Sequence, residues 1–197
     1  MVLPLPPCDT SRKTPSLFTY ADEGDKVMYP VPSFPYWGNT IRKATLNRPI
    51  ICSNPHILSN SVGNIIEKKI DDKVKLIIIN SPHNPFGSLL SKDQALKINE
   101  IAKGKGCKVL LDDVYRAFCK KEWIGNYFDM ENSIIVDSFS KRFGMPGLRL
   151  GFARVPKNEV KYFRASLANN YVGVSMSSVV IADFVLELFL NNKSLNS

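Results

Sequence analysis

The sequence predicts an α/β fold, a three-layer sandwich in which a mostly parallel β-sheet lies between helices. Three short runs, residues 75–79, 108–111 and 133–136, are rich in Val, Ile and Leu. Continuous apolar runs of this length are typical of strands that are buried on both faces, as in a parallel sheet. A well-marked helix lies between the first two runs, and this strand–helix–strand order predicts a right-handed crossover between parallel strands.

The helix between the first two strands carries its own start and stop signals. Ser91 and Gln94 form a capping box, because the serine side chain can accept a hydrogen bond from the backbone three residues on. Apolar residues then recur at helical spacing at Ala95, Ile98, Ile101 and Ala102. Gly104 is expected to end the helix, since glycine is common just past a helix C-terminus.

The remaining elements follow from weaker patterns. Strands are expected at 26–29, 49–52 and 148–155, and helices at 36–45, 60–70 and 158–167. An apolar helix is expected at 177–190, where the acids Asp183 and Glu187 are four residues apart and share one face. We expect this helix to be buried on nearly all other sides, either in a core or against a partner.

Composition favours a soluble domain in a cytoplasmic compartment. The chain has 197 residues, of which 44% are hydrophobic, and prolines crowd residues 1–15. We expect an irregular arm at 1–15 and one domain at 16–197. No signal peptide or membrane span is apparent, since the longest apolar stretch, 179–190, is short and interrupted by acids. The four cysteines are scattered without a C-x-x-C motif, which predicts reduced thiols and no metal site.

The net charge of +8 raises the question of a nucleic-acid partner. The basic clusters are short, scattered and mixed with acids, as at 103–105 and 120–121, and no zinc-finger or recognition-helix pattern is present. A solvated surface, or attraction of anionic substrates and phosphates, accounts for the charge. No nucleic-acid binding and no membrane binding are therefore predicted.

Polar residues follow each of the three strong strands. Asn80 follows the first, Asp112 the second, and the pair Asp137 and Ser138 the third. In an open α/β sheet, ligands bind at the carboxyl ends of the strands. Three neighbouring strands that each deliver polar groups to that edge predict a binding site there.

Three motifs near these strand ends resemble one known family. Residues 138–151 read SFSKRFGMPGLRLG, residues 80–87 read NSPHNPFG, and residues 112–115 read DDVY. Their order and spacing resemble the lysine signature, the N-x-P-x-N-P-x-G turn and the D-x-x-Y motif of class I/II aminotransferases, which are fold type I pyridoxal-phosphate enzymes. The resemblance covers residues 17–190 and implies the large, cofactor-binding domain of that fold.

The resemblance implies a role for each motif residue toward pyridoxal 5'-phosphate. Lys141 would hold the cofactor as a Schiff base and shuttle a proton at the substrate carbon. Asp112 would face the ring nitrogen, with Asp113 pointing to the opposite side, and Tyr115 and Asn84 would hydrogen-bond the ring oxygen. The phosphate would be held by Ser138, Ser140 and Arg149.

Other implied features have ordinary structural alternatives. The resemblance suggests that Phe34 stacks on the cofactor ring, with Tyr36 and Trp37 as rivals, although aromatic residues taken alone more often belong to the core. The Asn84–Pro85 bond would be cis, whereas most such bonds are trans. His83 is read as a turn residue, and Arg149 could instead form a surface ion pair.

The expected activity is transfer of an amino group between an amino acid and a 2-oxo acid, by a homodimer. The alternatives are another fold type I activity (lyase, decarboxylase or synthase) or a truncated, non-catalytic domain. The family's glycine turn for the phosphate would fall at 8–15, which contains no glycine. Its small domain, with the arginine for the substrate carboxylate, has no counterpart here, so we expect an incomplete large domain.

Overall fold

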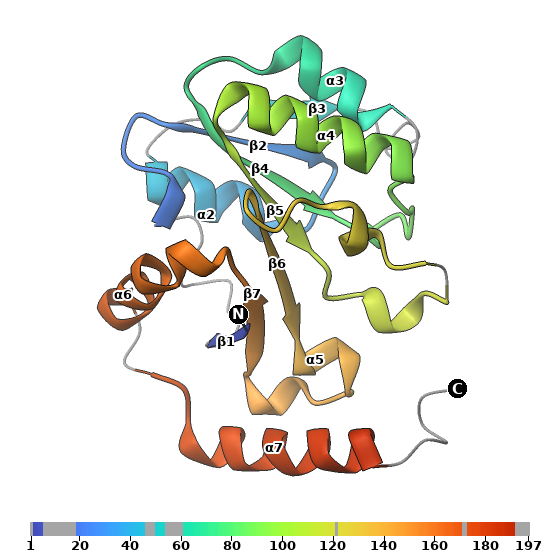
Figure 1. The fold of residues 1–197 in the computed structure, drawn as a ribbon, viewed down its shortest axis with the longest axis vertical. Helices are drawn as coiled ribbons and strands as arrows, with labels where there is room; N and C mark the ends of the chain where they lie inside the picture. The colour runs from blue at the N-terminus through green and yellow to red at the C-terminus, as the bar shows by residue number, and fades with distance from the viewer. Residues whose placement is uncertain are drawn as a thin grey trace.

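The computed structural model describes residues 2–5, 19–45, 50–53, 61–120, 122–170 and 173–191. Within these residues, seven strands form one sheet in the order β1-β7-β6-β5-β4-β2-β3 (Figure 1). The strands are β1 (Val2–Leu5), β2 (Lys26–Val31), β3 (Ile50–Ser53), β4 (Val74–Asn80), β5 (Lys108–Asp112), β6 (Ser133–Ser138) and β7 (Gly151–Arg154). The strands from β3 to β6 pair in parallel, whereas β7 is antiparallel to both β6 and β1. The predicted α/β fold with a mostly parallel sheet is confirmed.

Helices cover both faces of this sheet. The α-helices are α2 (Tyr36–Thr45), α3 (Val62–Lys69), α4 (Lys92–Lys105), α5 (Phe139–Arg142), α6 (Val160–Asn170) and α7 (Met176–Asn191). Short 3-10 helices are η2 (Arg116–Phe118), η3 (Ile124–Tyr127), η4 (Pro146–Leu148) and η5 (Lys157–Glu159). The helices α3 and α4 lie on one face, and α2 and α6 on the other (Figure 1). The structure is therefore a three-layer sandwich, as the sequence predicts.

Side chains along the central strands point alternately to the two faces of the sheet, and each face has its own hydrophobic core. In β5, Val109 and Leu111 pack with α3 and α4, whereas Leu110 packs with α2 and α6. All three side chains are completely buried. Because successive side chains in a strand point to opposite faces, this alternation also decides the face on which Asp112 lies.

The helix α4 begins where the sequence predicts and ends later. The Ser91 hydroxyl accepts a hydrogen bond from the backbone N–H of Gln94 at 3.4 Å, which confirms the serine cap. The side chain of Gln94 accepts from the backbone N–H of Gly63 at 2.8 Å. The predicted stop at Gly104 is wrong. The helix runs through Gly104 to Lys105, and Gly106 ends it in the left-handed conformation with a φ of 64°. Both glycines fit the general rule, and only the backbone shows which one leaves the helix.

Three further expectations need correction. Residues 2–5 of the expected irregular arm form β1, which pairs with β7, while 6–15 lie outside the described residues. The strand expected at 148–155 begins only at Gly151, because η4 ends at Leu148 and Arg149 has a left-handed backbone. The helix expected at 177–190 forms as α7 but is not buried in a core: Ala182 is its buried residue, and Met176, Phe184 and Leu190 are more than 60% exposed. Among the described residues, no helix is long and apolar enough to span a membrane.

Candidate active site

Register brings the predicted polar residues to one edge of the sheet. Asn80, the last residue of β4, pairs with Asp112, the last residue of β5. Asp112 in turn pairs with Val136 of β6, two residues before Ser138 ends that strand. The carboxyl ends of three adjacent parallel strands therefore deliver an amide, a carboxyl group and a hydroxyl to the same edge.

Asp112 is a buried carboxyl group with few hydrogen-bond donors around it. The residue is 7% exposed, and its Oδ1 accepts one long hydrogen bond, from the backbone N–H of Val114 at 3.4 Å. Burial raises the pKa of Asp112 to about 7, and the neighbouring carboxyl groups of Asp113 and Asp137 add to the rise. The indole N–H of Trp37 opposes it without forming a hydrogen bond of good geometry. A cation placed against Asp112 would favour its charged form.

Asp113 points to the opposite face, as predicted. Its Oδ2 accepts a hydrogen bond from the indole Nε1 of Trp123 at 2.8 Å, whereas its buried Oδ1 has no hydrogen-bond partner within the described residues. Trp123 packs on the core of α3 and α4, and Trp37 on the core of α2 and α6. Burial raises the pKa of Asp113 to about 7, a rise that Trp123 and Arg142 oppose.

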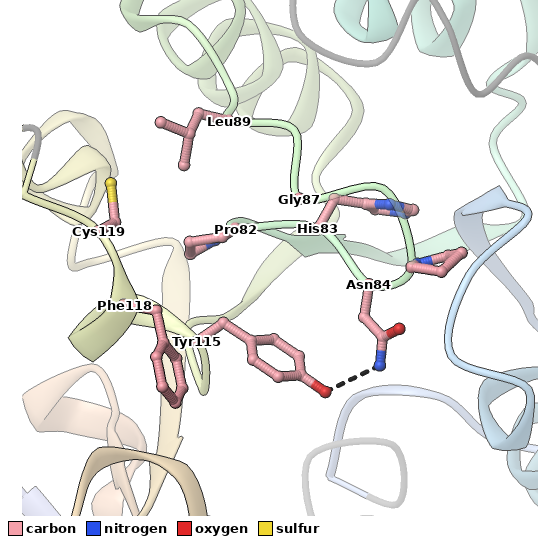
Figure 2. A pocket seen from close by; sticks show the side chains of 9 residues that line it. Pro82, His83, Asn84, Gly87, Leu89, Tyr115, Phe118 and Cys119 are labelled. Carbon is pink, nitrogen blue, oxygen red and sulfur yellow. Dashed lines mark hydrogen bonds between the residues drawn. The ribbon is translucent and has the colours of Figure 1, made fainter.

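Asn84 and Tyr115 are joined directly. The Nδ2 of Asn84 donates a hydrogen bond to the Tyr115 hydroxyl at 2.8 Å (Figure 2). Asn80 fixes this pair to the sheet, because its Oδ1 accepts from the Asn84 backbone N–H at 2.7 Å and its Nδ2 donates to the carbonyl of Asp112 at 2.9 Å. Burial raises the pKa of Tyr115, and the bond from Asn84 opposes the rise. The two motifs therefore meet at a polar pair that can donate to one ligand oxygen.

The turn that carries Asn84 has a cis bond at Asn84–Pro85, as the resemblance implies. It closes with a hydrogen bond from the backbone N–H of Gly87 to the carbonyl of His83 at 2.7 Å, and Gly87 has a φ of 66°. His83 is more than a turn residue. It is 4% exposed, stacks on Phe86 with ring centroids 5.7 Å apart, and has a pKa lowered by burial.

Lys141 lies on α5, which begins immediately after β6. Its side chain is exposed, and its Nζ lies 5.7 Å from the centroid of the Tyr115 ring. The ammonium group is therefore within cation–π distance of the tyrosine that Asn84 contacts. The structure thus brings together Lys141, Tyr115, Asn84 and, one strand end away, Asp112.

Arg149 follows η4 in a left-handed conformation, with a φ of 49°. Such a φ is uncommon for a residue other than glycine. Its side chain is exposed and its Nη1 donates to the carbonyl of Pro146 at 2.9 Å. Gly151, two residues on, pairs in register with Ser138, so Arg149 lies near the strand end that carries the two serines. The ion pair considered for Arg149 is not among the salt bridges of the described residues.

The three aromatic candidates differ in their surroundings. Trp37 is 5% exposed and belongs to the core of α2 and α6. Phe34 is half-buried and packs against the edge of that core. The side chain of Tyr36, like residues 8–15, lies outside what the structure describes. Of the two described rings, Phe34 has the more accessible face.

A cavity of about 390 Å³ opens beside the Asn84–Tyr115 pair. Its wall combines these two residues with apolar groups, among them Pro82, Leu89 and Phe118 (Figure 2). Within the described residues, no group of three or more His, Cys, Asp or Glu side chains could hold a metal ion. The chemistry available at this edge is that of an amine, carboxyl groups, a phenol and an amide.

Comparison with known proteins identifies the family. A family model described as Aminotransferase class I and II matches residues 5–191. The chain belongs to the class I and II aminotransferase family. Histidinol-phosphate aminotransferase 1 of Archaeoglobus fulgidus is 32% identical over 74% of this chain and 43% of its own length. The aspartate aminotransferase of Sulfolobus acidocaldarius is 38% identical over 55% of this chain and 28% of its own.

Solved aminotransferases share the fold. A PLP-dependent aminotransferase from Streptococcus suis 89-1591 superposes with a TM-score of 0.79 at 19% identity, over 96% of this chain and 50% of that one. N-Succinyldiaminopimelate aminotransferase from Mycobacterium tuberculosis gives a TM-score of 0.76 at 21% identity, over 92% and 49%. The chain therefore spans about half the length of these two solved structures.

Two residues near the aminotransferase motifs carry interactions that the sequence analysis did not anticipate. Trp37 is a rival for ring stacking in the sequence, whereas its indole lies in the core and lowers the pKa of Asp112. Arg142 has no assigned role in the three motifs, yet it forms an ion pair with the buried Asp137. A signal for Arg142 exists in the sequence: it is a basic residue five positions after Asp137, an acid near the end of a predicted strand.

Proposed function

We propose that this chain forms the pyridoxal 5'-phosphate-holding part of an aminotransferase, which moves an amino group between an amino acid and a 2-oxo acid through Lys141. The observation that carries the proposal is the shared edge of the sheet. There the buried carboxyl group of Asp112 lies one strand end from the Asn84–Tyr115 pair, and the Lys141 ammonium lies over the Tyr115 ring.

The residues present fit this cofactor. Asp112 is buried and, among the described residues, has no ion pair, so a protonated pyridine nitrogen would supply the missing positive charge. The polar pair of Asn84 and Tyr115 can donate to a phenolic ring oxygen. When bound, pyridoxal phosphate supplies an electron sink for the substrate carbon, and the protein supplies position and electrostatics.

Other side chains of this chain would hold the cofactor and move a proton. Lys141 would hold the cofactor covalently and, once released by substrate, move a proton at the substrate carbon with its Nζ. Ser138, Ser140 and Arg149 would donate hydrogen bonds to the phosphate, for which Arg149 has to exchange its bond to the Pro146 carbonyl. Phe34 would lie against the ring, since its partly exposed position suits a stacking contact.

The substrates are proposed only as a class. The relatives' names include histidinol-phosphate and aspartate aminotransferases, so amino-group transfer is what they have in common. An amino acid and a 2-oxo acid are therefore the proposed substrates. A homodimer is the proposed assembly, supported by the exposed apolar residues of α7.

The test of the lysine assignment is covalent capture of the cofactor by the full chain. Purified protein is mixed with pyridoxal phosphate, its visible absorption is recorded, and the complex is reduced with borohydride and mapped by peptide mass spectrometry. We expect label on Lys141 and an at least tenfold loss of it in Lys141→Ala. Lys103→Ala, a change at an exposed lysine of α4, is the control and should leave labelling intact. Label spread evenly over surface lysines would contradict the proposal.

The choice of Asp112 over Asp113 is tested with a matched pair. Asp112→Asn removes the charge that would face the ring nitrogen, whereas Asp113→Asn removes a charge on the opposite face, bonded to Trp123. A hydrogen bond to a charged group contributes about 1.5–3 kcal/mol, so we expect Asp112→Asn to weaken cofactor binding roughly 10- to 100-fold. Equal weakening by both changes, measured by absorption titration, would count against the assignment.

A further inference from the structure

The segment that carries Lys141 cannot hold its own conformation. The helix α5 comprises four residues, Phe139–Arg142, between the end of β6 and the loop to η4 (Figure 1). Isolated helices shorter than about 12 residues are marginal in water, because nucleation is unfavourable. Contacts outside α5 must therefore fix the direction in which Lys141 points.

One side of α5 is held by an aromatic cluster. Phe139 is 4% exposed, and its ring lies 4.9 Å from that of Phe143 and edge-on to that of Phe152 at 6.2 Å. Its backbone N–H donates to the carbonyl of Leu150 at 3.0 Å. This cluster holds Phe139 at the start of α5 and Phe143 directly after its end, whereas Arg142 lies outside it.

The other side of α5 is held by one carboxylate. The Oδ1 of Asp137 accepts a hydrogen bond from the Ser138 backbone N–H at 2.6 Å, and its Oδ2 accepts from the Nε of Arg142 at 2.6 Å. The Nη2 of Arg142 also contacts that Oδ2. Asp137 therefore joins the residue before α5 to the last residue of α5, and Lys141 lies in the closed segment. The Asp137 side chain is 4% exposed, so the pair is largely shielded from water on that side.

Arg142 also balances a second buried acid. Asp113 lies on the same face of the sheet as Asp137, and the guanidinium of Arg142 lowers the pKa values of both carboxyl groups against the effect of burial. The Asp113 Oδ1 has no hydrogen-bond partner within the described residues. Removing one partner of a buried ion pair leaves an uncompensated charge, which is strongly unfavourable. Asp137 therefore binds Arg142 directly, and Asp113 attracts the same guanidinium without an ion pair among the described residues.

We propose that Asp137 and Arg142 form an ion-pair clasp that positions Lys141, so that both are positioning residues for cofactor capture. The clasp itself rests on the geometry of β6 and α5, and its consequence for capture rests on the function proposed above. The pair is separate from the apolar packing beside α5, to which Phe139 and Phe143 contribute.

The first measurement needs no cofactor. Amide hydrogen exchange of the full chain is followed over residues 138–145 in Arg142→Met, Asp137→Asn and the double variant. We expect exchange in this segment to be at least tenfold faster in each single variant, with no larger effect in the double variant, because one interaction is lost. Arg164→Met, the same change at an exposed arginine of α6, is the control and should leave the segment unchanged.

The second measurement is borohydride-trapped pyridoxal phosphate, mapped by mass spectrometry. We expect the label on Lys141, relative to other lysines, to fall at least fivefold in Arg142→Met and to recover in part in Arg142→Lys, which keeps the charge. Recovery by the conservative variant separates positioning from a general loss of fold. If Arg142→Met does not fold, the label on Lys141 is compared between Asp137→Asn, which removes the ion pair, and Arg142→Lys, which keeps the charge.

The two measurements separate the two proposals. Unchanged exchange over 138–145 in both single variants would overturn the clasp, whatever the labelling shows. Faster exchange with undiminished capture at Lys141 would also overturn it as a positioning device. If the unchanged chain does not capture the cofactor at Lys141, the proposed function fails, and the exchange data still decide whether the clasp orders α5.

Discussion

Two adjacent carboxyl groups at the end of β5, Asp112 and Asp113, connect the candidate site to the stability of the chain. Burial raises the pKa of each from 3.8 to about 7. A carboxyl group whose pKa is higher in the folded than in the unfolded state stabilises the fold at low pH, and this contribution is lost as the pH rises through the folded pKa. A change of this size corresponds to roughly 4 kcal/mol for one group. The neighbouring carboxyl group of Asp113 adds to the rise in the pKa of Asp112.

The free energy of unfolding should therefore depend on pH differently in the unchanged chain and in a variant that lacks one of these acids. In the cofactor-free chain, we expect Asp112→Asn to raise the free energy of unfolding at pH 8 relative to the unchanged protein, and to have a smaller effect near pH 4. The difference between the two profiles should grow between about pH 4 and 7. Urea unfolding at several pH values measures the free energy of unfolding of both proteins. Subtracting one profile from the other cancels the contributions of the acids that both proteins share. Profiles that stay parallel across this range would show that Asp112 is not held in an unfavourable charged state.

At the scale of elements, the two glycines near the end of α4 give a matched test of how the helix stops. Gly104 is helical, and an added Cβ there would meet nothing within 4 Å, whereas Gly106 has a φ of 64°. Alanine in a helix interior is favoured over glycine by about 0.8–1.0 kcal/mol. In the left-handed conformation a Cβ costs roughly 1–2 kcal/mol.

We therefore expect Gly104→Ala to stabilise the chain and Gly106→Ala to destabilise it. For a chain of about 200 residues, 1 kcal/mol corresponds to a change of roughly 2–4 °C in Tm. Thermal unfolding of the two variants should show changes of opposite sign. A loss of Tm in Gly104→Ala as large as in Gly106→Ala would mean that the helix ends at Gly104, as its sequence alone suggests.

The elements that the sequence predicts well are those whose environment is uniform. Continuous Ile and Leu in β4 and β5 fit only a strand with two buried faces, and Asp112 follows from the strand end and its motif. Contacts between side chains of different elements cannot be predicted from a local sequence pattern. The burial of His83 depends on how a turn folds back, and the pairing of Arg142 with Asp137 depends on the angle between β6 and α5. Similarly, the sequence shows that α7 is apolar and does not show what lies against it.

At the scale of the whole molecule, α7 is the feature that a single copy leaves unexplained. Its aromatic Phe189 packs edge-on against Phe143 at 5.6 Å, and Ala182 is buried, so the helix packs beside α5, beyond the end of β6 (Figure 1). Its other large apolar residues face outward, with Phe184 61% and Leu188 47% exposed. Soluble monomers rarely expose a contiguous apolar patch of this kind, and such patches commonly mark interfaces.

We expect a second copy of the chain to cover this face of α7. Association driven by apolar burial is non-directional and sensitive to a charge placed in the contact. Sedimentation velocity over a range of concentrations should therefore show a dimer for the unchanged chain and a shift toward monomer in Phe184→Asp. Lys161→Asp, a charge change at an exposed residue of α6, is the control and should leave the dimer intact. A chain that stays monomeric at every concentration would exclude a second copy as the cover.

The helix α7 contacts Phe143, which directly follows Lys141 and Arg142. Loss of the dimer should therefore also loosen α5 and lower cofactor capture at Lys141. Unchanged capture in Phe184→Asp would show that the dimer contact and the cofactor site are independent.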